Sequence, residues 1–179
     1  MALIDSSVIL PGTGFLFTAP AETPQPASLT APASPWVNLG HTSREDGLTI
    51  TRDGGDSEVL GTWQNPSLRE RRDPSTYAIT AILHQIDNNA MEMYFGPGDV
   101  SVAGEFGVTS VTATTEKALY VRIVDGLNEV GIYVPKVSIA SDDDVEVDVE
   151  AFLGFPIRAT VLQVTGSNLL TLFGAELGA

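Results

Sequence analysis

Hydrophobic and polar residues alternate along much of the chain, and the clearest alternation begins at Tyr77. Residues 77–84 read YAITAILH, so side chains point in turn to two faces, one of them almost wholly apolar. A period of two is that of a β-strand. Because Ala78 and Ile82 make the second face partly apolar as well, we expect this strand to be covered on both sides.

The strand is followed by the one convincing helix pattern in the sequence. Asp87 is suited to be its N-cap, because its carboxylate can accept a hydrogen bond from a free amide of the first turn. Gly96 can adopt the left-handed conformation that ends a helix, and Pro97 cannot continue one. Ile86 and Met91 then occupy the positions of a hydrophobic staple. A helix this short needs a sheet to lie on.

Two hairpins are expected elsewhere. The first joins residues 48–52 to residues 58–64 through DGGD, whose residues tolerate a positive φ. The second joins residues 118–124 to residues 129–134 through DGLN, where Gly126 is the candidate for a positive φ. Both pairs alternate with a period of two, as strands do.

Five more segments have strand-like patterns: residues 99–108, 108–114, 144–150, 152–164 and 168–173. Within SDDDVEVDVEAF the alternation is strict from Asp144 to Glu150, where acidic residues fall on one face and valines on the other. The predicted fold is therefore mainly β with one short α-helix. We expect two packed sheets, or one sheet that curls towards a barrel, with the helix laid against it.

Residues 1–35 differ in composition from the rest of the chain. They are rich in Ala, Pro and Thr, and their prolines favour an extended backbone, although Phe15 to Phe17 has the pattern of one strand. We therefore divide the chain into an N-terminal extended arm, 1–35, and a single β-sandwich domain, 36–179. The arm is either a disordered tail or a segment that docks on a neighbouring subunit, with Trp36 as its anchor.

Charge excludes one class of function. The 179 residues contain 23 Asp and Glu against 9 Lys and Arg, a formal net charge of -14. Tight binding of nucleic acid requires cations that neutralise phosphates, which this composition lacks. Hydrophobic residues make up 43% and charged residues only 18%, which is enough for a core and favours some surface being buried against neighbours.

The residues needed for catalysis or metal binding are scarce. There is no cysteine and there are two histidines, His41 in a polar turn and His84 on a strand. Asp53, Asp56 and Glu58 lack the spacing of a calcium loop. We expect no enzyme, no cofactor and no metal site. Neither a signal peptide nor a membrane span is expected, so no membrane binding is predicted.

Three arginines, one third of the positive charge, lie within four residues at Arg69, Arg71 and Arg72. A cluster of this kind either contacts phosphate or pairs with carboxylates. Because acids far outnumber bases here and Arg makes directional two-pronged contacts, we favour carboxylates across a subunit boundary.

Residues 39–96 resemble the major tail subunits that form the tail tube of long-tailed bacteriophages, especially those of actinobacterial hosts. The resemblance implies a structural virion protein, assembled in the host cytoplasm and located in the tail. It implies hexameric rings that stack into a tube around a tape-measure protein, through which DNA later passes. The alternative is a soluble β-sandwich binding module, an adhesin or carbohydrate-binding domain, that exposes Trp36, Trp63 and Tyr133.

A wall past which DNA moves should be acidic or neutral, because phosphates held by Lys or Arg would have to break charge contacts at every step. The polar strand faces supply two sets of candidates for the lumen. The set on the first hairpin is Glu58, Thr62 and Gln64, and the set on the acidic strand is Asp144, Glu146, Asp148 and Glu150.

Overall fold

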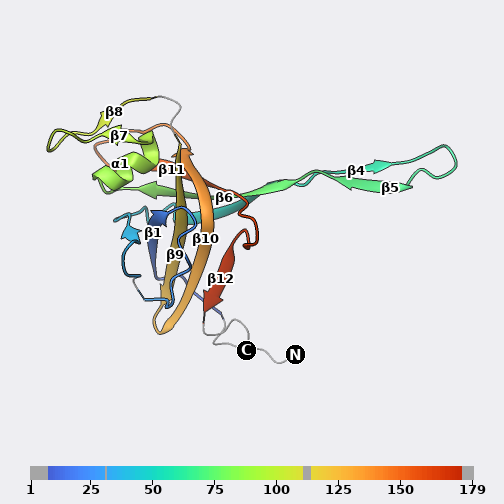
Figure 1. Ribbon diagram of the computed structural model, residues 1–179, viewed down its shortest axis with the longest axis horizontal. Coiled ribbons are helices and arrows are strands. Elements are labelled where there is room, and N and C mark those ends of the chain that lie inside the picture. Colours follow the sequence, from blue (N-terminus) through green and yellow to red (C-terminus); the bar gives the residue numbers. More distant parts are fainter. Residues whose placement is uncertain (1–7, 31, 111–113, 175–179) are drawn as a thin grey trace.

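The computed structural model describes residues 8–30, 32–110 and 114–174. It shows a body of antiparallel strands from which a long two-stranded ribbon projects (Figure 1). The elements in chain order are β1 Thr13–Pro20, β2 Val37–Asn38, β3 Leu48–Gly54, β4 Ser57–Leu60, β5 Arg69–Arg72, β6 Ser75–Leu83, α1 Asn88–Phe95, β7 Gly98–Asp99, β8 Gly107–Val108, β9 Thr115–Asp125, β10 Asn128–Ser141, β11 Phe155–Val161 and β12 Thr171–Gly174.

Eight strands form the main sheet, in the order β2-β1-β9-β10-β11-β6-β3, with β12 paired to β10 beside this path. The long strand β10 pairs with β9 along one edge and divides its other edge between β12 and β11. A register shift between Val134 and Val137 marks the place where β10 changes partner. In Figure 1, β9 and β10 run in a clearly different direction from β3 and β6, so the sheet bends sharply. The mainly β fold is confirmed, and the bent sheet does not close into a barrel.

The main core lies between the inner face of this sheet and α1. Alternate residues of the strands point into it, and Ala90, Met91 and Met93 bury one side of the helix. The predicted helix ends are confirmed, since Asp87 Oδ1 accepts a hydrogen bond from the Ala90 amide at 2.9 Å and Gly96 has a φ of 81°. The predicted staple is wrong, because Ile86 is 63% exposed.

The outer face of β1, β9 and β10 carries a second, aromatic layer. Tyr120 stacks on Phe17 and on Phe173, and Trp36 meets Tyr120 and Tyr133 edge-on, with ring centroids 6.0 and 6.2 Å apart. Residues 21–30 and 32–36 cover this layer. They are held there by hydrogen bonds from the Glu22 amide to the Pro135 carbonyl, from the Tyr133 hydroxyl to the Thr23 carbonyl and from the Tyr120 hydroxyl to the Leu29 carbonyl.

The structure therefore places much of the expected arm on its own subunit. β1 is an inner strand of the main sheet, between β2 and β9, because its apolar run at Phe15 to Phe17 pairs in register with β9. Residues 21–30 and 32–36 lie against the same sheet.

The first predicted hairpin is wrong. β3 pairs with β6, from Leu48 opposite Ala81 to Gly54 opposite Ser75, and β4 pairs with β5. Gly54 and Gly55, with φ of 79° and 81°, continue one long strand path from β3 into β4 instead of reversing it. The true reversal lies between β4 and β5, where the Thr62 and Asn65 backbones exchange hydrogen bonds.

The second predicted hairpin is confirmed, with Gly126 at a φ of 60° between β9 and β10. The strands predicted over 99–108 and 108–114 are wrong in the described residues, where only β7 and β8 form, two residues each; residues 111–113 lie outside that part of the chain. The acidic strand is also wrong. β10 ends at Ser141, and residues 142–154 form a loop because no neighbouring strand offers them a ladder of hydrogen bonds.

Candidate assembly surfaces

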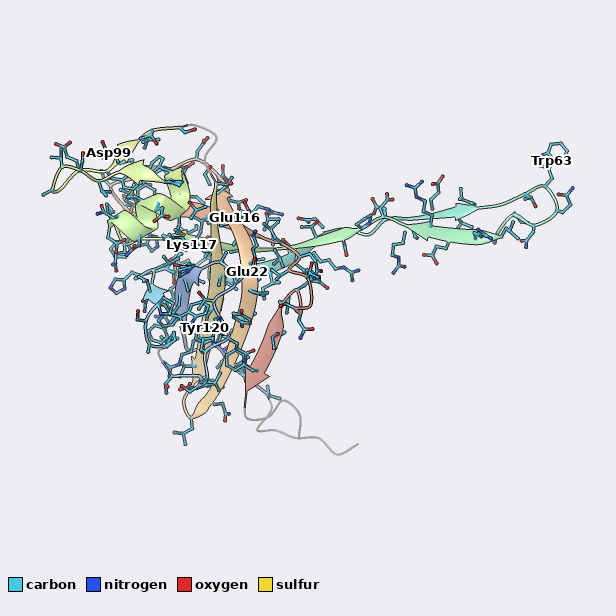
Figure 2. The ribbon with its side chains drawn as sticks, viewed as in Figure 1. Glu22, Trp63, Asp99, Glu116, Lys117 and Tyr120 are labelled. Atoms are coloured by element: carbon cyan, nitrogen blue, oxygen red, sulfur yellow. The ribbon has the colours of Figure 1, made fainter. Side chains whose placement is uncertain are left out.

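The part of the ribbon farthest from the body, residues 57–72, is called the distal ribbon below. All eight residues of β4 and β5 are exposed. At the tip, the Trp63 side chain is 101% exposed and points away from the rest of the chain (Figure 2). Leu60 and Leu68 are exposed as well. Within the part of the chain that the structure describes, the distal ribbon therefore has no contact surface on the rest of its subunit.

Pairing register divides the side chains of the distal ribbon between two faces, because residues opposite each other on antiparallel strands share a face. One face, called the arginine face, carries Glu58, Leu60, Arg69 and Arg71. The other carries Ser57, Val59, Glu70 and Arg72.

The two faces differ in how their charges are paired. On the second face, Arg72 Nη2 lies 3.3 Å from Glu70 Oε1. On the arginine face, Arg71 reaches only Asp73, at 3.9 Å, and Arg69 has no carboxylate within 4.0 Å in the part of the chain that the structure describes.

Most of the other Lys and Arg side chains lie on the body and already form ion pairs within the subunit. Arg122 makes a two-pronged contact with Glu129, at 3.1 and 2.5 Å, and this hydrogen bonding raises the pKa of Arg122. Lys117 pairs with Glu92 at 3.1 Å, and Lys136 with Glu116 at 2.8 Å. The arginine face is thus a place where positive charge remains available to a partner.

Residues 142–152 are called the acidic loop below. They contain six acids and no Lys or Arg. Asp142 lies 3.8 Å from Arg158, but the other five acids have no basic partner within 4.0 Å among the described residues. Three large apolar side chains of the same loop are also exposed: Val147 at 86%, Val149 at 102% and Phe152 at 85%. The loop is fastened to α1 by a hydrogen bond from the Tyr94 hydroxyl to the Asp143 carbonyl.

One polar sheet face remains uncovered by the helix. Across β3, β6 and β11, the side opposite the core carries four threonines, Thr49, Thr51, Thr80 and Thr160. Thr49 lies opposite Thr80, and Thr51 and Thr160 lie on either side of Ala78. We call this the threonine face. Arg158, which lies opposite Thr80 on this face, donates a hydrogen bond to Asp53, so these two charges are balanced.

The structure locates every residue predicted for the lumen or for a subunit boundary. Glu58, Thr62 and Gln64 lie on the distal ribbon, and Asp144, Glu146, Asp148 and Glu150 lie on the acidic loop, so neither set is on a strand of the main sheet. Arg69, Arg71 and Arg72 lie together on β5. The threonine face was missed, although the alternating Thr49 and Thr51 were visible in the sequence.

The binding-module alternative needed exposed aromatic side chains. Trp36 and Tyr133 instead contact each other within the aromatic layer, and only Trp63 of the three is fully exposed. The alternative is therefore not supported.

The two histidines take part in hydrogen bonds that join neighbouring segments of the chain. His84 Nδ1 lies 3.0 Å from the Leu153 carbonyl oxygen, and the His84 amide bonds to the His41 carbonyl. The polar turn after His41 is closed by Ser43, whose hydroxyl donates to Asp46 at 2.6 Å. Within residues 8–30, 32–110 and 114–174, no three His, Asp or Glu side chains are grouped to hold a metal ion. In the same ranges, α1 is too short to cross a membrane.

Comparison with known proteins identifies the family of the chain. The model of the phage tail tube protein family matches residues 1–177. The chain is also 35% identical, over 176 residues, to the major tail protein Gp23 of Mycobacterium phage D29 and to that of Mycobacterium phage L5, covering 90% of this chain and 88% of each relative. The chain thus belongs to the phage tail tube protein family and is a structural subunit of the virion tail.

Proposed function

We propose that copies of this subunit join into hexameric rings, and that the rings stack into a tube that encloses a tape-measure protein and later conducts DNA. The observation that carries this proposal is the distal ribbon, in which β4 and β5 are exposed throughout and Trp63 is 101% exposed at the tip. The subunit has a structural role in this proposal and no reaction to catalyse.

A ribbon of this kind is poorly stabilised by itself. An isolated two-stranded hairpin is at best marginally stable in water, and burying an exposed tryptophan against a partner removes a large apolar surface from water. From Asp56 to Trp63 the chain extends by roughly 23 Å at the usual rise per strand residue. The distal ribbon can therefore reach a neighbouring copy, and such a contact would give it the surface that its own subunit lacks.

The main sheet supports the proposal in a second way. Among the described strands it ends in β2 and β3, each of which has a neighbour on one side only. Unpaired strand edges promote association, and closure into a ring removes them. Contacts made head to tail, with a different surface on each partner, produce rings when the rotation closes.

The lumen wall in this proposal is the threonine face. It is polar, uncovered by the helix, and its Asp53 and Arg158 form a balanced pair. Hydroxyl groups have no charge that would retain phosphates, so DNA could slide past without breaking ion pairs. Glu58, Thr62, Gln64 and the acidic loop are better explained as contact surfaces between copies, since none of them lies on the main sheet.

Imaging and native mass measurement of the purified protein test the proposal, with and without its tail partners. Rings of six copies or tubes are expected, and a protein that stays monomeric at high concentration under both conditions would contradict it.

A ribbon deletion makes the test specific. Replacing residues 57–72 by Asn-Gly joins Asp56 to Asp73, whose backbones are already hydrogen-bonded at 2.9 Å, through a favoured two-residue turn. This variant should fold with wild-type thermal stability and fail to assemble. Normal tubes from it would show that the distal ribbon is not an assembly element.

A further inference from the structure

Within the proposed tube, the distal ribbon needs a receiving surface on another copy, and the structure limits the choice. The arginine face carries Arg69 and Arg71 with little internal pairing, beside the exposed Leu60. The distal ribbon has three arginines against two glutamates, a net charge of +1 in a chain of net charge -14. A complementary surface must be acidic and partly apolar.

The acidic loop has both properties. Five of its acids lack a basic partner in the described part of the chain, and Val147, Val149 and Phe152 are exposed between and after them. Unpaired like charges beside exposed apolar side chains are unfavourable in an isolated subunit. A partner that brings arginines together with apolar residues relieves both problems.

The positions of the acidic loop and the distal ribbon within the subunit also favour a contact between two copies. The acidic loop is tied to α1 through Tyr94 and Asp143, and α1 lies on the side of the body opposite the distal ribbon (Figure 1). One molecule therefore cannot bring its own ribbon to its own loop. Because the two surfaces are different and lie at opposite ends, copies that join them head to tail can build rings or stacks.

We propose that the arginine face of the distal ribbon docks on the acidic loop of a second copy of this chain. Arg69 and Arg71 pair there with the unpartnered carboxylates, and Leu60 and Trp63 cover the exposed valines. This inference rests on the proposed tube and identifies one of its contacts.

Charge reversal in the full-length protein tests the docking. With Arg69→Glu and Arg71→Glu together, like charges meet across the contact, so the protein concentration needed for tubes should rise at least about tenfold at low salt. The matched control is Arg72→Glu, the same change on the opposite face of the same strand, which should assemble as wild type. All three side chains are exposed, so thermal unfolding should be unchanged.

A compensating charge reversal on the acidic loop completes the test. Adding Asp144→Arg and Glu146→Arg to the doubly reversed chain should restore assembly, whereas these two changes alone should impair it. Wild-type assembly by the Arg69→Glu, Arg71→Glu variant, an equal defect in Arg72→Glu, or no restoration would each overturn the docking. If the wild-type chain itself forms no rings or tubes, the proposed function fails instead.

Cross-linking reports on the contact without reversing any charge. The chain has no cysteine, so Thr62→Cys in one preparation and Val147→Cys in another can be joined selectively by a short bismaleimide. A mixed product is expected. The control places cysteine at Leu127, which is at least as exposed as Val147 but lies in the turn between β9 and β10. Equal yield with Leu127→Cys, or no product with Val147→Cys, would overturn the proposal.

Discussion

The hydroxyl of Tyr133, on β10, donates a hydrogen bond to the backbone carbonyl oxygen of Thr23 at 2.6 Å, across 110 positions of sequence. With the similar bond from Tyr120 to Leu29, at 3.0 Å, it holds residues 21–30 against the aromatic outer face of the sheet. The proline-rich N-terminal segment is therefore part of the subunit's own packing.

Tyr133→Phe should lower the free energy of unfolding by about 1 kcal/mol, since it removes one hydrogen bond and leaves the Thr23 carbonyl without that donor. Chemical denaturation measures the change. Tyr77→Phe is the control, because the Tyr77 ring contacts Arg52 and its hydroxyl has no hydrogen bond among the described residues. An equal loss in both variants would contradict the role given to the Tyr133 hydroxyl.

Replacing residues 21–35 by a short Gly-Ser linker should destabilise the subunit by more than Tyr133→Phe does. The linker uncovers the ring layer of Phe17, Tyr120 and Phe173 and removes both tyrosine bonds together. The midpoint of thermal unfolding is the measurement. An unchanged midpoint combined with lost assembly would instead show that this segment serves a neighbouring subunit.

Asp87→Ala removes the helix cap and should cost ~1 kcal/mol of stability. Met91→Asp should cost more, because it places a charge at a buried position where α1 meets the sheet. Asn89→Ala, on the exposed side of the helix, is the control. If thermal unfolding of Met91→Asp matched the wild type, the packing of α1 described above would be wrong.

Stability should fall at alkaline pH. Burial raises the pKa of Tyr94, Tyr120 and Tyr133, so the folded state holds these protons more tightly than the unfolded chain. The stabilisation that these tyrosines contribute is fully present below their unfolded-state pKa of about 10. It is lost as the pH rises through their higher folded-state pKa values. Denaturation midpoints measured from neutral pH to about pH 11 should decline, and less steeply in Tyr133→Phe than in wild type. The same decline in both would contradict this assignment.

Thr49→Lys tests the threonine face as the lumen wall. The substitution adds a cation on an exposed strand position, so tubes should form while DNA release from virions slows, with the defect easing as salt rises. Glu58→Lys is the comparison, since Glu58 lies on the distal ribbon. Slower release from Glu58→Lys but not from Thr49→Lys would place the ribbon, and not the threonine face, at the lumen.

The amino-acid sequence by itself determined the elements that depend only on residues close together in the chain. Asp87 and Gly96 define the ends of α1 because a side-chain hydrogen bond and a positive φ act within one turn of helix. Gly126 defines the β9–β10 turn for the same reason. Alternation over β6 identified its strand, and the resemblance in residues 39–96 identified the family that the comparisons confirmed.

Tertiary structure decided which strands pair. Residues 53–56 have the composition of a hairpin turn, yet β3 pairs with β6, because β6 offers it seven partners in register. The acids and valines of residues 144–150 alternate perfectly, but alternation makes a strand only where a neighbouring strand accepts its hydrogen bonds. Trp36, expected at a neighbour, packs on Tyr120. Contacts between residues far apart in the sequence depend on the whole sheet, so the distal ribbon, the acidic loop and the threonine face emerged only from the fold.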